Sequence, residues 1–174
     1  MTQTSLPPVR DERTLLLDYL RAQREHILGA LDGLDDEALR RSVLPSGWSC
    51  LGLVQHLTLD VERFWFAGVM AGDPAVLDAL EAGGNAWSVG PDVPAAGVLD
   101  AYRQEIARSN AVIAGLDLSA PPGFWPDGMF GSWHPESLRR VILHVLTETS
   151  AHTGHLDVVR ELIDGQQWLV LTEG

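Results

Sequence analysis

The segment CLGLVQHLTLDVERFWFAGVMAG, residues 50–72, decides the fold. Its apolar residues cover most of a helical circumference and do not alternate with polar ones as in a half-buried strand. A helix that is apolar on most faces has to be covered by other elements. Pro45 and Gly47 break the chain just before it, and Ser46 or Ser49 can cap its first turn. We therefore expect a buried helix with other helices packed around it.

Three further long segments space their apolar residues three and four apart, which predicts amphipathic helices over residues 11–31, 94–116 and 135–164. Gly33 and Gly165 are placed to end the first and the last of these. Long segments joined by irregular loops predict an all-α fold, an antiparallel four-helix bundle. We expect one domain over residues 1–174.

The remaining segments are expected to be short or irregular. Residues 35–41 and 75–82 can add short helices, residues 1–10 read as a loose lead-in, and residues 167–172 as a short strand or an extended cap. Two long loops are predicted, and the first, over residues 73–93, is rich in Gly, Ala, Pro and Asp. The second, over residues 117–134, carries Trp125, Phe130 and Trp133 among Pro and Gly. Because long loops are often functional, this aromatic one is of interest.

Composition narrows the function classes. The net charge is −12, and the twelve basic residues, all Arg, form no cluster. Since phosphate contacts need clustered cations, we expect no nucleic acid and no anionic membrane as a partner. No stretch is long and apolar enough to span a bilayer, and MTQTSLPPVRDER at the start does not resemble a signal peptide. The lone Cys50 forms no internal disulfide and fits a reducing compartment, so we expect a cytoplasmic protein.

The stretch HVLTETSAHTGH, residues 144–155, contains three His and one Glu that could bind a metal ion. At about 100° per residue, His144, Glu148, His152 and His155 fall within an arc of about 80° on the last helix. Glu148 and His152 are one turn apart and can chelate one ion. His56, on the facing helix, would supply a third ligand, as in other bundles that hold metals. Three protein ligands leave a coordination position open, which is typical of a catalytic site.

Several alternatives stay open at this point. His155 competes with Glu148, because it lies three residues after His152 and could reach the same ion. A single His56 on an apolar helix is more often a hydrogen-bonded core residue than a ligand. His144 lies one turn before Glu148 and is expected near the ligands or at the surface.

Other polar residues have weaker claims. Asp60, four residues after His56, could orient that imidazole or be a solvated charge. Cys50 begins a helix, where a thiol pKa falls, but small buried packing is the favoured interpretation. His26 and His134 have no polar company in sequence and are interpreted as structural.

Two segments together, SGWSCLGLVQHLTLDVERFWF (46–66) and ETSAHTGHLDVVRELIDG (148–165), resemble the DinB/YfiT-like superfamily. The resemblance covers about residues 12–170 and is strongest to actinobacterial members related to the N-terminal domain of mycothiol-dependent maleylpyruvate isomerase. It implies a metal triad of His56, Glu148 and His152. Most members carry His at the first position of the last-helix pair. The Glu148 in that position and the additional His155 leave the third ligand open.

The resemblance also implies a function. Members use low-molecular-weight thiols, so it implies a metal-dependent thiol S-transferase or isomerase acting on a small-molecule electrophile. The divalent metal would be zinc or nickel, and the all-Arg composition fits an actinobacterium with mycothiol as the thiol. A homodimer through the aromatic helix is expected. No catalytic group beyond the ligands is assigned. The alternatives are a metal-dependent hydrolase and a non-enzymatic dimeric helical bundle.

Overall fold

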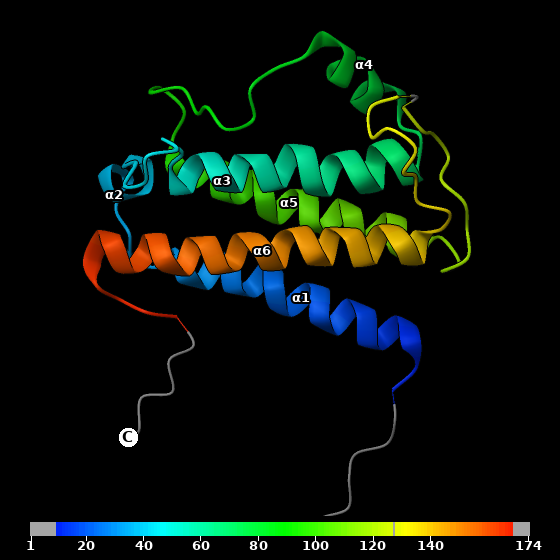
Figure 1. Ribbon diagram of the computed structural model, residues 1–174, viewed down its shortest axis with the longest axis horizontal. Helices are drawn as coiled ribbons and strands as arrows, with labels where there is room; N and C mark the ends of the chain where they lie inside the picture. Colours follow the sequence, from blue (N-terminus) through cyan, green and yellow to red (C-terminus); the bar gives the residue numbers. More distant parts are fainter. Residues whose placement is uncertain (1–9, 127, 169–174) are drawn as a thin grey trace, which may run out of the picture.

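The computed structural model describes residues 10–126 and 128–168, and every regular element among them is a helix. The elements, labelled in Figure 1, are α1 (Glu12–Ala30), α2 (Asp36–Arg40), α3 (Cys50–His56), η1 (Leu57–Met70), α4 (Pro74–Ala82), α5 (Ala95–Ala114) and α6 (Leu138–Asp164). The all-α prediction is confirmed for these residues. None of these helices is long and apolar enough to cross a membrane. The predicted lead-in and tail lie mostly outside the described residues.

Local signals in the sequence set most helix ends. Asp11 caps α1 by accepting a hydrogen bond from the Thr14 amide, and Ser49 caps α3 by accepting one from the Gly52 amide. Gly165 ends α6 in the left-handed conformation that glycine adopts without strain. The last helix begins at Leu138 rather than near residue 135. The Leu138 amide donates to the Ala120 carbonyl, which ties the helix start to the preceding loop.

The predicted helix over residues 50–72 is present, but its winding changes part-way. It is α-helical as α3 and continues as η1, a π-helix, from Leu57. His56 is the last α-helical residue. Wide turns of this kind occur often at functional sites. Most of η1 is buried, as its apolar composition predicted.

Neighbouring helices do not all alternate in direction. Glu12 pairs with Arg139 near the starts of α1 and α6, and His26 pairs with Asp157 near their ends, so these helices run parallel. In contrast, His56 lies beside His152 and Trp65 beside His144, so α3–η1 and α6 are antiparallel. The prediction of an antiparallel bundle is therefore wrong for α1 and α6, and it is also wrong for α5, which runs parallel to α3–η1.

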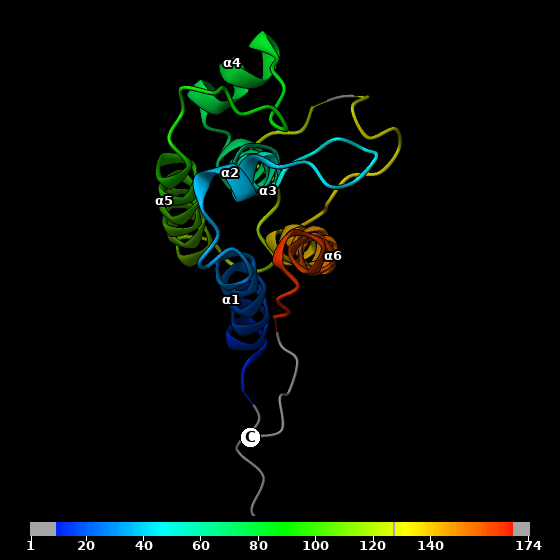
Figure 2. The same ribbon diagram turned by 90° about the vertical axis from the view of Figure 1, so that its left-hand side faces the viewer.

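A single long crossover explains this difference. The chain between η1 and α5 includes α4 and runs back along α3–η1 until the Trp87 carbonyl lies against Gly52. α5 therefore starts near the start of α3 and runs parallel to α3–η1, and α6 then returns alongside α1. Figure 2 shows α1, α3, α5 and α6 end-on around a common interior, with α4 outside α3. Crossovers of this kind are known in helical bundles.

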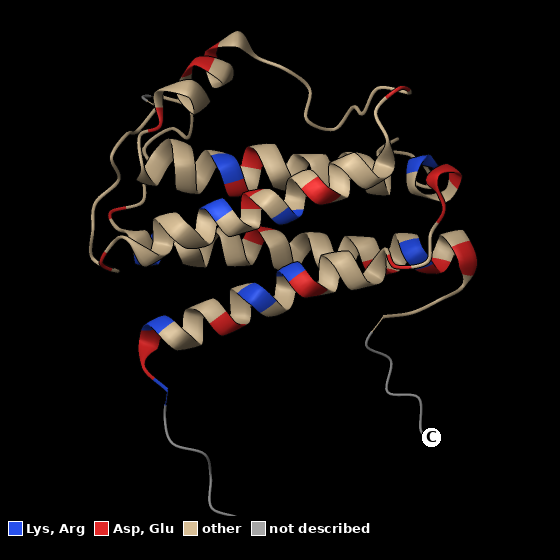
Figure 3. Ribbon diagram, turned by 180° about the vertical axis from the view of Figure 1, so that it is seen from behind, with Lys and Arg blue, Asp and Glu red and all other residues tan. Residues whose placement is uncertain are grey.

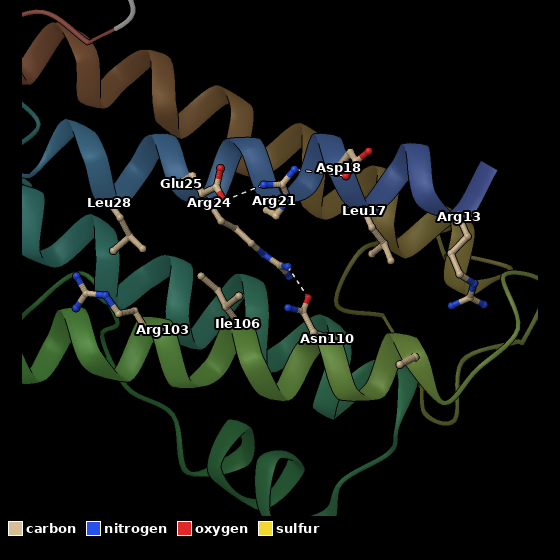
Figure 4. Close-up of a pocket in the computed structure, with 11 residues that line it drawn as sticks. Arg13, Leu17, Asp18, Arg21, Arg24, Glu25, Leu28, Arg103, Ile106 and Asn110 are labelled. Atoms are coloured by element: carbon tan, nitrogen blue, oxygen red, sulfur yellow. Dashed lines mark hydrogen bonds and ion pairs between the residues drawn. The ribbon is translucent and has the colours of Figure 1, made fainter. Parts of the chain in front are cut away.

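Among the described residues, one ion pair has both side chains buried. Arg24 of α1 donates from Nε and Nη2 to the two carboxylate oxygens of Glu62 on η1, at 2.6 Å each. Its Nη1 donates to Asn110 of α5 at 2.9 Å, a contact drawn in Figure 4. Arg24 and Glu62 are 4% and 1% exposed. Bidentate pairing balances the charges and links three helices.

Charges at the surface are interspersed rather than clustered. Figure 3 shows acidic and basic positions alternating along α1 and α5. Many are locally paired: Arg21 with Glu25, and Arg40 with Asp36, each one helical turn apart. Such exposed pairs contribute little to stability.

Loss of the buried ion pair should lower the stability of the protein more than loss of an exposed pair. We expect Glu62→Gln to lower the free energy of unfolding by about 3–5 kcal/mol, because it leaves the Arg24 charge buried without a counter-charge. The matched control, Glu25→Gln, breaks the exposed pair with Arg21 and should change it by about 0.5 kcal/mol or less. Urea unfolding measures both. Equal effects would contradict the central role of the buried pair.

Candidate functional site

Two imidazoles from different helices meet at the junction of α3 and η1. The rings of His56 and His152 lie edge to face, with centroids 5.1 Å apart. Their side chains are 15% and 13% exposed. Antiparallel packing of α6 on α3–η1 places them together. The predicted juxtaposition of these two residues is present in the structure.

Two neighbours fix the orientation of His56. The Asp60 carboxylate lies 2.9 Å from Nδ1, one turn further along the helix. Since a carboxylate can only accept, Nδ1 carries the proton of this bond, and in the neutral ring Nε2 then has the lone pair. On its face, His56 stacks on the indole of Trp87, with centroids 4.2 Å apart and the planes 17° from parallel. The imidazole is thereby held in one tautomer and one plane.

Trp87 is itself held by α3. Gln55 donates from Nε2 to the carbonyls of Ala86 and Ser88, on either side of Trp87, at 2.8 and 3.1 Å. At Gly52, a Cβ atom would lie only 2.3 Å from the Trp87 carbonyl oxygen. The glycine therefore lets the crossover backbone approach α3 closely enough for the indole to cover His56.

His152 is kept neutral. Burial, and next the neighbouring His56, lower its pKa to about 4, although Glu148 acts in the opposite direction. Neutral imidazole is the form that binds metal ions. Its Nδ1 is buried and has no hydrogen-bond partner among the described residues. A buried nitrogen without a hydrogen-bond partner is costly.

Glu148 lies one turn before His152 on α6, as the spacing predicted. Its Oε2 is 4.0 Å from His152 Nε2, and its side chain is 44% exposed. The exposed His155 has its ring 5.8 Å from that of His152. Within the described part of the chain, no three His, Cys, Asp or Glu side chains stand as a ready metal-binding set. Metal binding therefore remains a prediction.

A pocket of about 770 Å³ adjoins these groups, and His56, Asp60 and Glu148 are among its lining residues. Its other walls come from η1, α4, residues 83–86 after α4, and the loop between α5 and α6. His144 also lines it, one turn before Glu148. Burial lowers the pKa of His144. Groups with shifted pKa values beside a largely apolar pocket are typical of functional sites.

Comparison with known proteins identifies the family. The family model described as mycothiol S-transferase matches residues 15–165. The chain belongs to the mycothiol S-transferase family. This family is part of the DinB-like superfamily, so the predicted superfamily is confirmed. No curated protein matches the chain.

A second pocket, of about 650 Å³, lacks side chains that could bind a metal ion through nitrogen or sulfur. It lies between α1 and α5 (Figure 4). Its lining arginines are already engaged: Arg13 with carbonyls at the end of α5, Arg21 with Asp18 and Glu25, and Arg103 with Asp100. None of its lining residues is a His or a Cys.

The remaining candidates have structural surroundings. Cys50 is fully buried, and burial raises the pKa of its thiol to about 11, which disfavours a nucleophilic thiolate and agrees with the packing interpretation. His26 bonds to Asp157 at 2.7 Å. His134 is exposed in a loop. The thiol of a mycothiol S-transferase reaction would thus come from the cofactor.

Sequence reasoning missed Trp87. The segment around it, rich in Gly, Ala, Pro and Asp, was interpreted as an irregular loop. One available signal was the solitary large aromatic residue in that composition. The spacing of residues could not predict that Trp87 stacks on His56, because the path of the crossover between η1 and α5 brings the two together.

Gly52→Ala tests how Trp87 is held. The added methyl group meets the Trp87 carbonyl, so we expect a loss of about 1–3 kcal/mol in the free energy of unfolding. The upfield ring-current shift of the His56 ring protons in the NMR spectrum should also fall. Gly97→Ala in α5 is the matched control, since its Cβ would meet nothing within 4 Å. Unchanged His56 shifts in Gly52→Ala would contradict the proposed role of this close approach.

Proposed function

We propose that this chain transfers mycothiol to an electrophile at a divalent metal held by His56, Glu148 and His152. The observation that carries the proposal is the pair of mostly buried imidazoles on facing helices. One has a defined tautomer and the other is kept neutral. The family match supports mycothiol as the thiol. The described helices support a four-helix arrangement of the DinB type.

Glu148 and His152 fit one metal ion after a small movement. Two ligand atoms at about 2.0–2.2 Å from zinc in a tetrahedral site lie roughly 3.5 Å apart. The 4.0 Å between Glu148 Oε2 and His152 Nε2 is close to that separation. The partly exposed Glu148 side chain has room to turn toward the imidazoles. Zinc and nickel both suit such nitrogen and oxygen ligands.

A divalent ion bound there would lower the pKa of a thiol sulfur and favour the thiolate at neutral pH. The protein's own residues prepare the site for this. Asp60 holds His56 with its Nε2 lone pair available. Burial keeps His152 unprotonated. Trp87 covers the face of His56 and limits the access of water to it.

In the transfer step, the thiol loses its proton to solvent, and the electrons of the sulfur–hydrogen bond stay on the sulfur. The sulfur then donates an electron pair to the electrophilic carbon and forms a sulfur–carbon bond. When the carbon carries a halide, the carbon–halogen bond breaks and the halide leaves with its electron pair. No oxidant or reductant is needed.

The two alternative functions have less support. A metal-dependent hydrolase would use the same ligands, but the family match points to thiol transfer. A non-enzymatic dimer would explain the aromatic η1, but Phe64, Trp65 and Phe66 are already buried within one chain. A homodimer stays a prediction.

Metal content tests the proposal. Protein purified without chelator should carry roughly one divalent ion per chain, and His152→Ala should lose at least about 90% of it. The exposed His134→Ala is the matched control and should keep its metal. Elemental analysis measures occupancy, and mycothiol conjugation to monochlorobimane should fall in parallel. Glu148→Ala and His155→Ala, compared side by side, identify the third ligand.

Equal, near-zero metal in the parent protein and in His152→Ala would overturn the metal-dependent proposal. So would full bimane conjugation in a His152→Ala variant that is folded by circular dichroism.

A further inference from the structure

The pocket beside His56 and Glu148 has apolar walls from three separate elements. η1 contributes Phe64 and Trp65, α4 contributes Val76 and Leu80, and the loop between α5 and α6 contributes Phe130. The Phe130 ring lies 5.4 Å from that of Trp65 and 6.1 Å from that of Phe64. The loop therefore packs on η1 and completes an aromatic wall.

Three large apolar side chains of this pocket are exposed. Leu80, Met129 and Phe130 are 36%, 50% and 38% exposed, and all three line it. Single exposed apolar residues are ordinary, but a group around one pocket marks a site for an apolar ligand. The volume of about 770 Å³ lies within the range for drug-sized molecules.

The charges in the pocket exclude one class of ligand. Asp60 and Glu148 contribute two carboxyl groups. Among the described residues that line the pocket, Arg63 is the one permanent cation. It donates from Nε and Nη2 to Glu105, at 3.1 and 3.0 Å, and Glu105 is 1% exposed. Glu105 also accepts from Arg108 at 2.9 Å. Because Arg63 is held by this buried carboxylate, and the proposed metal ion by Glu148 and the thiolate, an anionic ligand would find no free counter-charge beside the apolar walls.

The apolar walls also distinguish between the two reactants. A sugar-linked thiol such as mycothiol needs partners for many hydroxyl groups, whereas twelve of the eighteen residues that line the pocket are apolar or glycine. An apolar reactant loses nothing there and gains from burial.

We infer that this pocket holds the electrophile, and that the electrophile is an uncharged compound with an apolar, aromatic body. The inference rests on the proposed thiol transfer and names its second substrate. Phe130 and Leu80 are then specificity-determining residues, which contact the body of the electrophile while its reactive carbon faces His56 and Glu148.

The test compares two matched electrophiles with mycothiol as the thiol. 1-Chloro-2,4-dinitrobenzene is uncharged, and 4-chloro-3-nitrobenzoate carries a carboxylate. Each kcat/KM is divided by the uncatalysed rate constant with mycothiol, which removes the difference in intrinsic reactivity. We expect the enhancement to be at least about tenfold larger for the uncharged compound. An equal or larger enhancement for the benzoate would overturn the inference.

Two variants locate the effect. Phe130→Ala should raise the KM for chlorodinitrobenzene about tenfold and leave the KM for mycothiol within about twofold. Tyr19→Ala, an exposed aromatic residue on α1 that does not line the pocket, is the control and should change neither. A rise in the mycothiol KM instead would place the thiol in this pocket and overturn the inference.

Leu80→Arg adds a free cation to the pocket wall and should shift the preference toward the benzoate by about tenfold. An unchanged preference would contradict the charge-based exclusion.

Failure of the proposed function gives a different result. In that case neither electrophile reacts, and the unreactive analogue 2,4-dinitrotoluene decides about the pocket. Its binding, followed by NMR shifts of Phe130 and Leu80, supports the apolar site even without transfer. Absence of such shifts at millimolar analogue overturns the pocket assignment itself.

Discussion

The contact between the imidazoles of His56 and His152 joins two helices that run in opposite directions, and the rest of the site is arranged around it. Each ring is mostly buried. The packing of α6 on α3–η1 sets their separation, while the burial of His152 keeps its ring neutral. Loosening this interface would separate the rings and hydrate both of them.

Other polar groups that are expensive to bury have partners. Arg24 and Glu62 balance each other inside the helical assembly, and Asp60 engages one nitrogen of His56. The Nδ1 atom of His152 is left without a partner among the described residues. Buried polar groups in folded proteins are normally paired. Tyr102 Oη and Ser109 Oγ on α5 are also buried without a partner among the described residues, but His152, unlike these two, can bind a metal ion.

Much of this structure follows from local sequence signals. Apolar spacing located the long helices, and Ser49 and Gly165 marked helix ends because capping depends on neighbouring backbone groups. The spacing of Glu148 and His152 placed them one turn apart for the same reason. Local rules therefore predicted the part of the candidate site that lies on α6, Glu148 and His152.

Long-range features were not predictable in this way. The parallel direction of α1 and α6 depends on the crossover between η1 and α5, whose composition carries no directional information. The stacking of Trp87 on His56 depends on the same crossover. The π-helical winding of η1 was missed because a helix that is apolar on most faces shows little difference between one period and another. The pairing of His56 with the last helix was anticipated from the facing-helix geometry of bundles and was strengthened by the family resemblance.

The central claim is that His56 and His152 bind the same metal ion, and anomalous X-ray scattering tests this claim most directly. Crystals of protein never exposed to chelator should show an anomalous peak bonded to an imidazole nitrogen of each residue, with Glu148 or His155 completing the set. A peak at another place in the chain would contradict the claim. So would zinc-soaked crystals with both rings well ordered and no density between them.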